Sequence, residues 1–413
     1  MVRKALRSLL IGLAVVVVSV LRLLSRVVTV RTFIGNHKLF GHLCLEPEKY
    51  LAAKSSGLEL YEIGFAGEKT PDNIGPIAFS QPKSKWTLDL WSFGKPNSRS
   101  NQALTRMWKR ELLVVPSFVV DVLLRANSRF KSRPIIDYRF STLLSSDRYL
   151  DSSDAHLQLT TKENQSARSA LRRMGLREGQ QFVCFVVREG GEAEALSRNH
   201  SVHDFEAAAL ALAEVGVAVI RMGATNCTPM KLKHDLVFDY ANTGNRSELA
   251  DIYLMANCLF AVSTMSGPDA LALAFRRPVL YIDVAHYGLV FSGTSLTTWV
   301  PARLIDMTTS NNLSLTESFT RGVGWYWKDS QFADAGIGIG KSTPDEIRSY
   351  VLEMFESNAY DGKTSALATQ KKYQTQMADV MGDLGRLWHG PIVSRLAPNF
   401  LEDNSEWFLG KNN

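Results

Sequence analysis

A short hydroxyl- and glycine-rich turn between two apolar segments is the feature of this chain best suited to binding an anion. It reads Ser263-Thr-Met-Ser-Gly267, it follows the apolar run that starts at Cys258, and Pro268 comes directly after it. Proline is favoured at the first position of a helix, so a helix is predicted to begin here. The backbone N–H groups at a helix start attract phosphate, and in open α/β folds they lie at the carboxyl edge of the sheet. The alternative is a turn that only connects a strand to a helix.

The candidate anion ligands in this turn are Thr264, Ser266 and Gly267. Asp269 lies in the first turn of the predicted helix, where its negative charge would repel a phosphate placed on the helix axis. We therefore expect Asp269 to face the hydroxyl groups of a ribose or sugar, while a nearby cation carries a diphosphate.

Two arginines are candidates for that cation. Arg188 follows the apolar segment 182–187, and Arg221 ends the next apolar segment along the chain. A guanidinium at the carboxyl end of a strand can form two parallel hydrogen bonds with a phosphate. Gly223, two residues after Arg221, would let a ligand approach the backbone closely. The alternative for Arg188 is an ordinary surface pair with Glu189.

Three histidines with neighbouring carboxylates are candidates for acid–base work. His42 is followed four residues later by Glu46, and it is the candidate general base for an acceptor hydroxyl. His200 and His203 lie in a polar cluster before a predicted helix, and they are secondary candidates. The alternatives are a histidine at a helix start for His42 and a simple helix cap for Asp204 in the cluster.

Several other kinds of chemistry are not expected. The chain has no P-loop pattern, no dinucleotide-type G-x-G-x-x-G after a strand and no convincing D-x-D metal site. Its four cysteines show no metal-binding spacing. We therefore expect no metal ion and no cofactor. Apart from its N-terminal end the chain is near neutral, so nucleic acid is not an expected partner either.

Short apolar strands alternate with amphipathic helices over the second half of the chain. This alternation predicts an α/β fold with a doubly wound parallel sheet, whose carboxyl edge would carry the candidate residues. Thr343-Pro-Asp-Glu346 is a capping box with proline at the first helical position, and it predicts a helix to about residue 356. The predicted strands are 182–187, 217–220, 236–240, 258–262 and 279–282, and the clearest predicted helices are 101–113, 205–215 and 248–256.

The N-terminal end of the chain differs from the rest. The chain has 413 residues and a formal charge of +6, but its first 45 residues hold seven Lys and Arg and no Asp or Glu. They also contain an apolar block at residues 9–21. This block is short for a membrane span, which needs about 20 residues, although the helix can be extended to Arg26. The alternatives are a single-span anchor, an interfacial helix, a signal peptide and a soluble core helix, and membrane contact is the expectation.

Nine short segments, in their order along the chain, have a familiar pattern. They are Gly41-His42-Leu43, Met107-Trp-Lys-Arg110, Phe185-Val-Val-Arg-Glu189, Val219-Ile-Arg-Met-Gly223, Phe238-Asp-Tyr240, Asp251-Ile252, Ser263-Thr-Met-Ser-Gly267, Thr343-Pro-Asp-Glu-Ile347 and Ser394-Arg-Leu-Ala-Pro-Asn-Phe400. Together they resemble a family of bacterial glycosyltransferases that is usually encoded with surface-polysaccharide genes. Arg188 also resembles the arginine that ends the first C-domain strand of GDP-fucose-dependent transferases, although Val186 and Glu189 depart from their H-x-R-R signature.

The resemblance implies a GT-B-like architecture, in which two Rossmann-like domains face each other across a cleft and the second domain holds most of the donor. An N-terminal apolar, membrane-associated helix would precede them. The expected parts are an anchor or interfacial helix at 1–33, an acceptor-side domain at 34–175, a nucleotide-sugar-binding domain at 176–365, and a C-terminal helix and tail at 366–413 that pack back on the body.

The expected function is metal-independent hexosyl or deoxyhexosyl transfer from a nucleotide-sugar to a glycan, lipid-linked or protein acceptor. In this scheme Arg188, Arg221 and the turn hold the diphosphate, and His42 activates the acceptor. The expected place is the cytoplasmic membrane, with the catalytic domains on the cytoplasmic side. The alternatives are a GT-B-type nucleotide-sugar 2-epimerase and a non-catalytic membrane-associated scaffold for glycan assembly.

Overall fold

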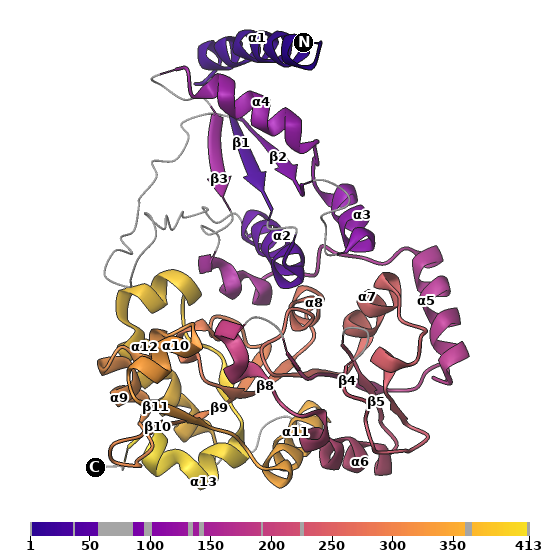
Figure 1. The fold of residues 1–413 in the computed structure, drawn as a ribbon, viewed down its shortest axis with the longest axis vertical. Helices are drawn as coiled ribbons and strands as arrows, with labels where there is room; N and C mark the ends of the chain where they lie inside the picture. The colour runs from indigo at the N-terminus through magenta and orange to yellow at the C-terminus, as the bar shows by residue number, and fades with distance from the viewer. Residues whose placement is uncertain are drawn as a thin grey trace.

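The computed structural model describes residues 2–35, 38–56, 86–94, 101–130, 135–139, 144–190, 193–223, 227–359 and 366–410. These residues form two lobes that follow one another along the long axis of the molecule (Figure 1). The smaller lobe is built from the N-terminal part of the chain and lies at the top of the view. The larger lobe lies below it and holds the C-terminus.

A seven-stranded, all-parallel sheet forms the centre of the larger lobe. Strand β4 lies inside the sheet, and the next two strands along the chain, β5 and β6, are added on one side of it. The chain then crosses to the other side of β4, where β7, β8, β9 and β12 follow in order. This is the Rossmann strand order, with its switch point between β4 and β7. The strands, in their order across the sheet, are β12 (Arg395–Leu396), β9 (Thr297–Pro301), β8 (Val279–Val284), β7 (Ala261–Ser263), β4 (Phe182–Val186), β5 (Ala218–Arg221) and β6 (Val237–Phe238).

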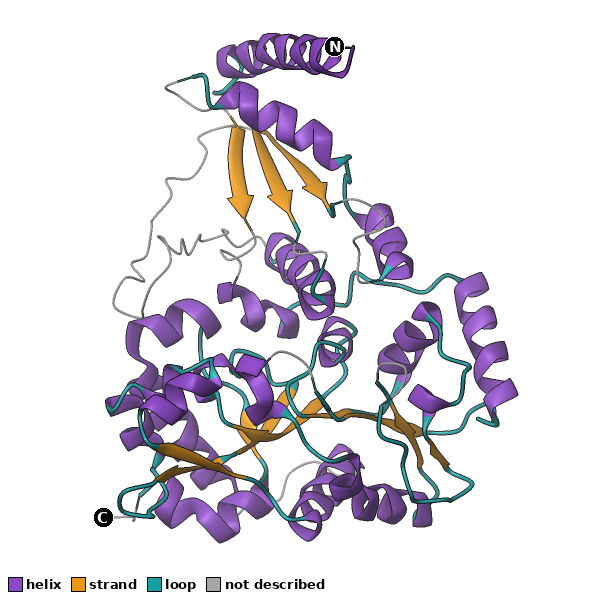
Figure 2. Ribbon diagram, in the orientation of Figure 1, coloured by secondary structure: helices purple, strands orange, loops and turns teal. Residues whose placement is uncertain are grey.

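Helices cover both faces of this sheet, as Figure 2 shows. The helix predicted from the capping box at Thr343 is confirmed, because Thr343 and Glu346 exchange the two expected hydrogen bonds. A two-stranded antiparallel ribbon of β10 (Arg303–Asp306) and β11 (Ile337–Gly340) lies beside the main sheet. The helices are α5 (Thr161–Met174), α6 (Glu206–Glu214), α7 (Glu248–Asn257), α8 (Asp269–Ala274), α9 (Leu315–Thr320), α10 (Asp329–Asp334), α11 (Pro344–Ala359), α12 (Ala366–His389) and α13 (Pro398–Phe408).

The smaller lobe has a parallel sheet of three described strands, in the order β2-β1-β3. The carboxyl ends of its strands point towards the larger lobe (Figure 1). The elements of this lobe are α1 (Val2–Leu23), β1 (Val28–Ile34), α2 (Phe40–Ser55), β2 (Trp86–Ser92), α3 (Gln102–Glu111), α4 (Ser117–Asn127), β3 (Ile135–Arg139) and the 3-10 helix η4 (Leu144–Asp151). The expected α/β class with parallel sheets is therefore confirmed.

The elements group differently from the expected parts at residues 33 and 175, and the C-terminal segment packs back on the larger lobe. Residue 33 lies within β1, the central strand of the smaller sheet, so the N-terminal helix is continuous with that lobe. Helix α5 was expected in the first domain, but it packs against α7 of the larger lobe. The segment after residue 366 supplies β12, which adds an edge strand to the large sheet. These limits follow from tertiary pairing, which a change in local sequence pattern does not report.

The apolar N-terminal segment forms helix α1, which packs along α4 with Ala14 and Val18 buried. Within the described parts of the chain, no helix combines the length and the apolar character that a bilayer crossing requires. The expectation of a membrane-spanning N-terminal helix has no support in these residues.

Candidate functional site

The carboxyl ends of β4 and β7 bring two candidate segments together at the switch point of the large sheet. Val186 pairs with Ser263 in the strand register, so the residues that follow each strand leave the sheet side by side. The backbone N–H of Arg188 donates a 3.0 Å hydrogen bond to the hydroxyl of Thr264. In an open parallel sheet this is the position where ligands bind.

A pocket of about 780 Å³ opens at this position between the two lobes. The larger lobe supplies the ends of β4 and β5 and the first turns of α7 and α8. The smaller lobe supplies Phe40 and Asn101. The polar residues on its walls are Asn101, Arg188, Glu189, Arg246, Ser247, Glu248, Asp251 and Ser266, and the apolar ones include Phe40, Val186, Val187, Met222, Met255 and Leu271. A volume of this size suits a ligand of nucleotide dimensions.

Arg188 is the cation best placed to meet an anion in this pocket. Its side chain is half-buried, and its Nε donates a 3.1 Å hydrogen bond to the side-chain oxygen of Asn199. Among the described residues, neither terminal nitrogen of the guanidinium has a hydrogen-bond partner. Thr264 holds the backbone of Arg188 and Asn199 orients its side chain, so the two terminal nitrogens remain available to two oxygens of a ligand.

The predicted anion site at the Ser263–Gly267 turn is occupied by the protein's own carboxylate. Asp269 accepts a 2.8 Å hydrogen bond from the Ser266 N–H and a 2.6 Å hydrogen bond from the Ser263 hydroxyl. Burial raises the pKa of Asp269 to about 6, although these hydrogen bonds oppose the rise. The Ser266 N–H is therefore not available to a phosphate. The Asp269 side chain is buried, so it does not face sugar hydroxyls in the pocket as expected.

Gly267 is in close contact with the backbone of the smaller lobe, which leaves little space for a side chain. A Cβ built on Gly267 would lie 3.2 Å from the backbone nitrogen of Gly41, and a Cβ on Gly41 would lie 3.3 Å from the Cα of Gly267. The two lobes therefore touch backbone to backbone at the start of α2 and the start of α8. A side chain at either position would push this contact apart by a few tenths of an ångström.

Arg221 does not reach the pocket. Its side chain is fully buried, with one terminal nitrogen 2.6 Å from Glu189 and the other 3.2 Å from Asp239. Both carboxylates compensate its charge, so Arg221 is unsuited to a diphosphate and the expected role is corrected. Gly223 does line the pocket, where a Cβ would come within 2.9 Å of the Cys227 sulfur. Its small size makes room for that neighbour as well as for a ligand.

His42 and Glu46 lie on the first turns of α2, and the Nδ1 of His42 contacts the Glu46 carboxylate. Burial lowers the pKa of His42, but the hydrogen bond and charge of Glu46 raise it more, so it ends above its usual 6.5. Burial raises the pKa of Glu46 to about 7, against the opposing effect of His42. Among the described residues, the Nε2 of His42 has no hydrogen-bond partner. Neither His42 nor Glu46 is on the wall of the pocket, although His42 follows Phe40, which is, by two residues.

The two secondary histidines belong to the framework. The Nε2 of His200 is 2.8 Å from Asp283, and both side chains are buried. Asp283 also accepts hydrogen bonds from the backbone and hydroxyl of Ser342, so this network fixes the chain before α11. His203 pairs with Glu206 at 3.1 Å beside the start of α6. Neither histidine lines the pocket, and we drop both as acceptor-binding candidates.

Apart from Asp251, which lies in one of the nine resembling segments, no sequence motif marked the pocket residues that come from α7 and the start of α3. Glu248 accepts hydrogen bonds from the backbone N–H groups of Gln102 and Ala103, at 3.0 and 2.9 Å. A carboxylate from the larger lobe thus caps a helix of the smaller lobe. Arg246 stands next to it and pairs with Asp251 at 2.9 Å. Asn101 is the first residue of the predicted helix 101–113, and in the structure its side chain caps α3.

Across the residues that the structure describes, no three His, Cys, Asp or Glu side chains gather as they would around a metal ion. This finding does not test the expectation of metal-independent chemistry, which requires an experiment.

No protein-family model matches the sequence, and no curated protein is significantly similar to it. Among solved structures, the glycosyl transferase family 9 protein from Veillonella parvula DSM 2008 has a TM-score of 0.41 and 9% identity, over 79% of this chain and 98% of its own. The iron-containing dodecameric glycosyltransferase TibC from enterotoxigenic E. coli H10407 has a TM-score of 0.37 and 11% identity, over 80% and 76%.

A second TibC structure, a heptosyltransferase complex with ADP-D-β-D-heptose, has a TM-score of 0.31 and 14% identity, over 80% of this chain and 77% of its own. At these TM-scores the likeness establishes no shared activity. The names of these three structures mention glycosyl and heptosyl transfer and do not mention fucosyl transfer.

Proposed function

We propose that this protein is a glycosyltransferase that moves a sugar from a nucleotide-sugar donor to a hydroxyl group of a glycan, lipid-linked or protein acceptor. The reaction would serve bacterial surface-polysaccharide or glycoconjugate biosynthesis. The observation that supports it best is the pocket at the switch point of the large sheet. There Arg188, whose terminal nitrogens have no hydrogen-bond partner among the described residues, lines a cavity of about 780 Å³ shared by two lobes.

In this proposal the nucleoside lies against the apolar wall formed by Val186, Met222 and Leu271. The diphosphate lies at Arg188, whose guanidinium binds two phosphate oxygens. Negative charge grows on the leaving diphosphate as the bond to the sugar breaks, and a fixed cation at that point stabilises the transition state. Because Arg188 supplies this charge, we propose that the transfer needs no metal ion.

The acceptor would approach from the side of the smaller lobe. The acceptor oxygen forms the new bond to the anomeric carbon, while the bond from that carbon to the phosphate oxygen breaks. His42 is the proposed base that takes the hydroxyl proton on Nε2, and Glu46 orients the ring through Nδ1. Nucleotide sugars are cytoplasmic metabolites, so we place the catalytic lobes on the cytoplasmic side of the membrane.

A thermal-shift screen tests the donor proposal directly. UDP-, GDP-, CMP-, dTDP- and ADP-sugars are added to the full chain, with and without EDTA. One nucleotide class is expected to raise the melting temperature by about 3 °C or more at saturation, equally in both conditions. Stabilisation by none of them would contradict the proposal and favour the non-catalytic scaffold. Conversion of the stabilising sugar without an acceptor would indicate an epimerase instead.

The pH dependence of transfer tests the His42–Glu46 pair. A base acts in its deprotonated form, so kcat/KM is expected to rise with pH through a midpoint above 6.5, the ordinary pKa of histidine. In Glu46→Gln the carboxylate that raises the pKa of His42 is gone, while burial still lowers it. The midpoint should therefore move to lower pH.

The matched control is Glu178→Gln, whose side chain is 63% exposed and pairs only with arginines of α5. Its pH profile should equal that of the unmodified protein. An unchanged midpoint in Glu46→Gln would exclude His42 as the titrating base.

A further inference from the structure

The part of helix α1 from Leu9 to Leu21 is apolar nearly all round, but the described part of the chain covers only one of its sides. Ala14 and Val18 face α4 and are buried together with Val30 and Ala126. On the outer side an apolar stripe is exposed, and its first three members, Leu9, Leu13 and Val16, are 69%, 66% and 62% exposed. The remaining members are Val17, Val20, Leu23 and Leu24. A helix that is apolar all round normally has all its sides covered.

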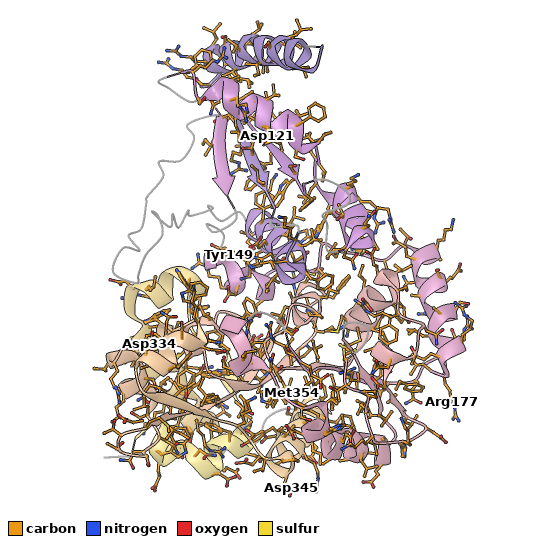
Figure 3. All side chains as sticks on the ribbon, in the orientation of Figure 1. Asp121, Tyr149, Arg177, Asp334, Asp345 and Met354 are labelled. Atoms are coloured by element: carbon orange, nitrogen blue, oxygen red, sulfur yellow. The ribbon has the colours of Figure 1, made fainter. Side chains whose placement is uncertain are left out.

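The outer stripe is continuous along the helix. Leu9, Leu13, Val16, Val20 and Leu23 follow each other at intervals of three or four residues, so they form one row along the axis. Helix α1 lies across the end of the smaller lobe, at the pole of the molecule farthest from the C-terminus (Figure 1). Figure 3 shows side chains of α1 projecting away from α4 into solvent at this pole. An exposed row of this kind marks a contact surface.

The charges around the stripe are almost all positive. Residues 8–30 and 113–130, whose side chains the structure describes, hold four Arg, no Lys and a single acidic residue, Asp121 on α4. Arg22 and Arg26 are exposed at one end of α1, and Arg22 lies 5.9 Å from the centre of the Phe130 ring. That contact brings this end of α1 beside the end of α4, which carries the exposed Arg125 and Arg129.

We propose that this surface, the outer stripe of α1 with its flanking arginines, binds flat on an anionic lipid membrane. The apolar row would enter the boundary between headgroups and acyl chains, and the arginines would meet lipid phosphates. A second copy of the chain is a poorer occupant. Helix α1 has no acidic residue, so two stripes packed together would bring only positive charges near each other, in parallel or antiparallel order.

Vesicle flotation of the full chain tests this inference, whatever reaction the protein catalyses. Binding to phosphatidylcholine vesicles that contain a quarter phosphatidylglycerol is expected, and it should weaken as salt is added. The double substitution Leu13→Ser, Val16→Ser should weaken binding by about tenfold or more, because two apolar side chains are lost from the inserted row. Both residues are exposed, so the melting temperature should not change.

Substitution of the arginines beside the stripe is a second, independent test of the proposal. An arginine near an anionic surface strengthens binding about fivefold, so Arg22→Gln with Arg26→Gln should weaken it by about 25-fold on anionic vesicles. The matched control is Val215→Ser, an exposed apolar residue at the end of α6 in the larger lobe, which should bind as the unmodified protein does. Equal binding to neutral and anionic vesicles would overturn the proposal. So would sedimentation showing that the stripe substitutions turn a dimer into a monomer without changing vesicle binding.

Discussion

Replacement of Arg188 by alanine is expected to lower kcat/KM for the nucleotide sugar by about 100-fold. Thr264 holds the backbone of Arg188 and Asn199 holds its Nε, which leaves the two terminal nitrogens for a ligand in the pocket that Arg188 lines. Losing them removes two charge-assisted hydrogen bonds that strengthen as charge develops on the diphosphate. Steady-state kinetics with the donor found in the thermal-shift screen measure the effect, and the thermal shift itself should shrink.

Two further variants make the result specific. Arg188→Lys keeps the positive charge, but its single ammonium group replaces a planar guanidinium that can bind two oxygens at once. This variant should therefore keep only part of the activity. Arg172→Ala is the matched control, because Arg172 is exposed on α5 and pairs only with Glu178. It should leave kcat/KM unchanged. Unchanged donor affinity and unchanged rate in Arg188→Ala would exclude Arg188 from the donor site.

Replacement of Asp147 by alanine is expected to lower the free energy of unfolding by about 3–5 kcal/mol. Asp147 lies in η4 and is almost completely buried, with Lys49 of α2 at 2.7 Å and His389 of α12 at 2.8 Å. Lys49 and His389 are themselves almost completely buried, so the truncation leaves Lys49 in the interior without its counter-charge. Urea or thermal unfolding measures the loss.

The same carboxylate should make the protein sensitive to acid. Burial alone would raise the pKa of Asp147, but the charges of Lys49 and His389 lower it below its ordinary 3.8. A folded-state pKa below the unfolded value stabilises the protein above about pH 4, and this contribution is lost as the pH falls through the folded-state pKa. The Asp147→Ala variant should therefore be less stable than the unmodified protein at neutral pH, and its free energy of unfolding should fall less as the pH is lowered.

Asp345→Ala is the control for Asp147→Ala. The Asp345 side chain is 91% exposed on α11 (Figure 3), and its nearest cation is 3.9 Å away. Exposed ion pairs of this kind contribute little, so its loss should change stability by less than about 0.5 kcal/mol. A loss of stability below about 1 kcal/mol in Asp147→Ala would contradict the role of this buried group in joining the two lobes.

The elements of the larger lobe were predictable because their local signals are strong. The strands at 182–187 and 279–282 are uninterrupted apolar runs, which is how strands buried on both faces read. The capping box at Thr343 starts α11 because its hydrogen bonds join residues three apart, within the reach of the local pattern. Chain connectivity then brings Arg188 and the Ser263–Gly267 turn to one edge of the sheet.

The use of each polar group was not predictable, because the folded arrangement selects its partner. That partner is distant in the chain for Arg221 and His200, whereas for the Ser266 N–H it is Asp269, three residues on. Arg221 looked equivalent to Arg188 in sequence, yet Glu189 and Asp239 surround it in the folded protein. The Ser266 N–H was expected to be free, but the Asp269 side chain turns back and occupies it. His200 likewise finds Asp283, which lies in β8.

The sequence by itself therefore determined which segments become strands and helices, and which residues stand at the ends of the strands. Periodicity and capping report the burial and hydrogen bonding of a residue and its near neighbours, and they do so wherever the segment is finally packed. Only the tertiary structure decided that Arg188 keeps two nitrogens for a ligand, that Gly41 meets Gly267, and that Phe40 and Asn101 complete the pocket. Those facts depend on which elements the lobes bring together, and that arrangement is set by packing over the whole chain.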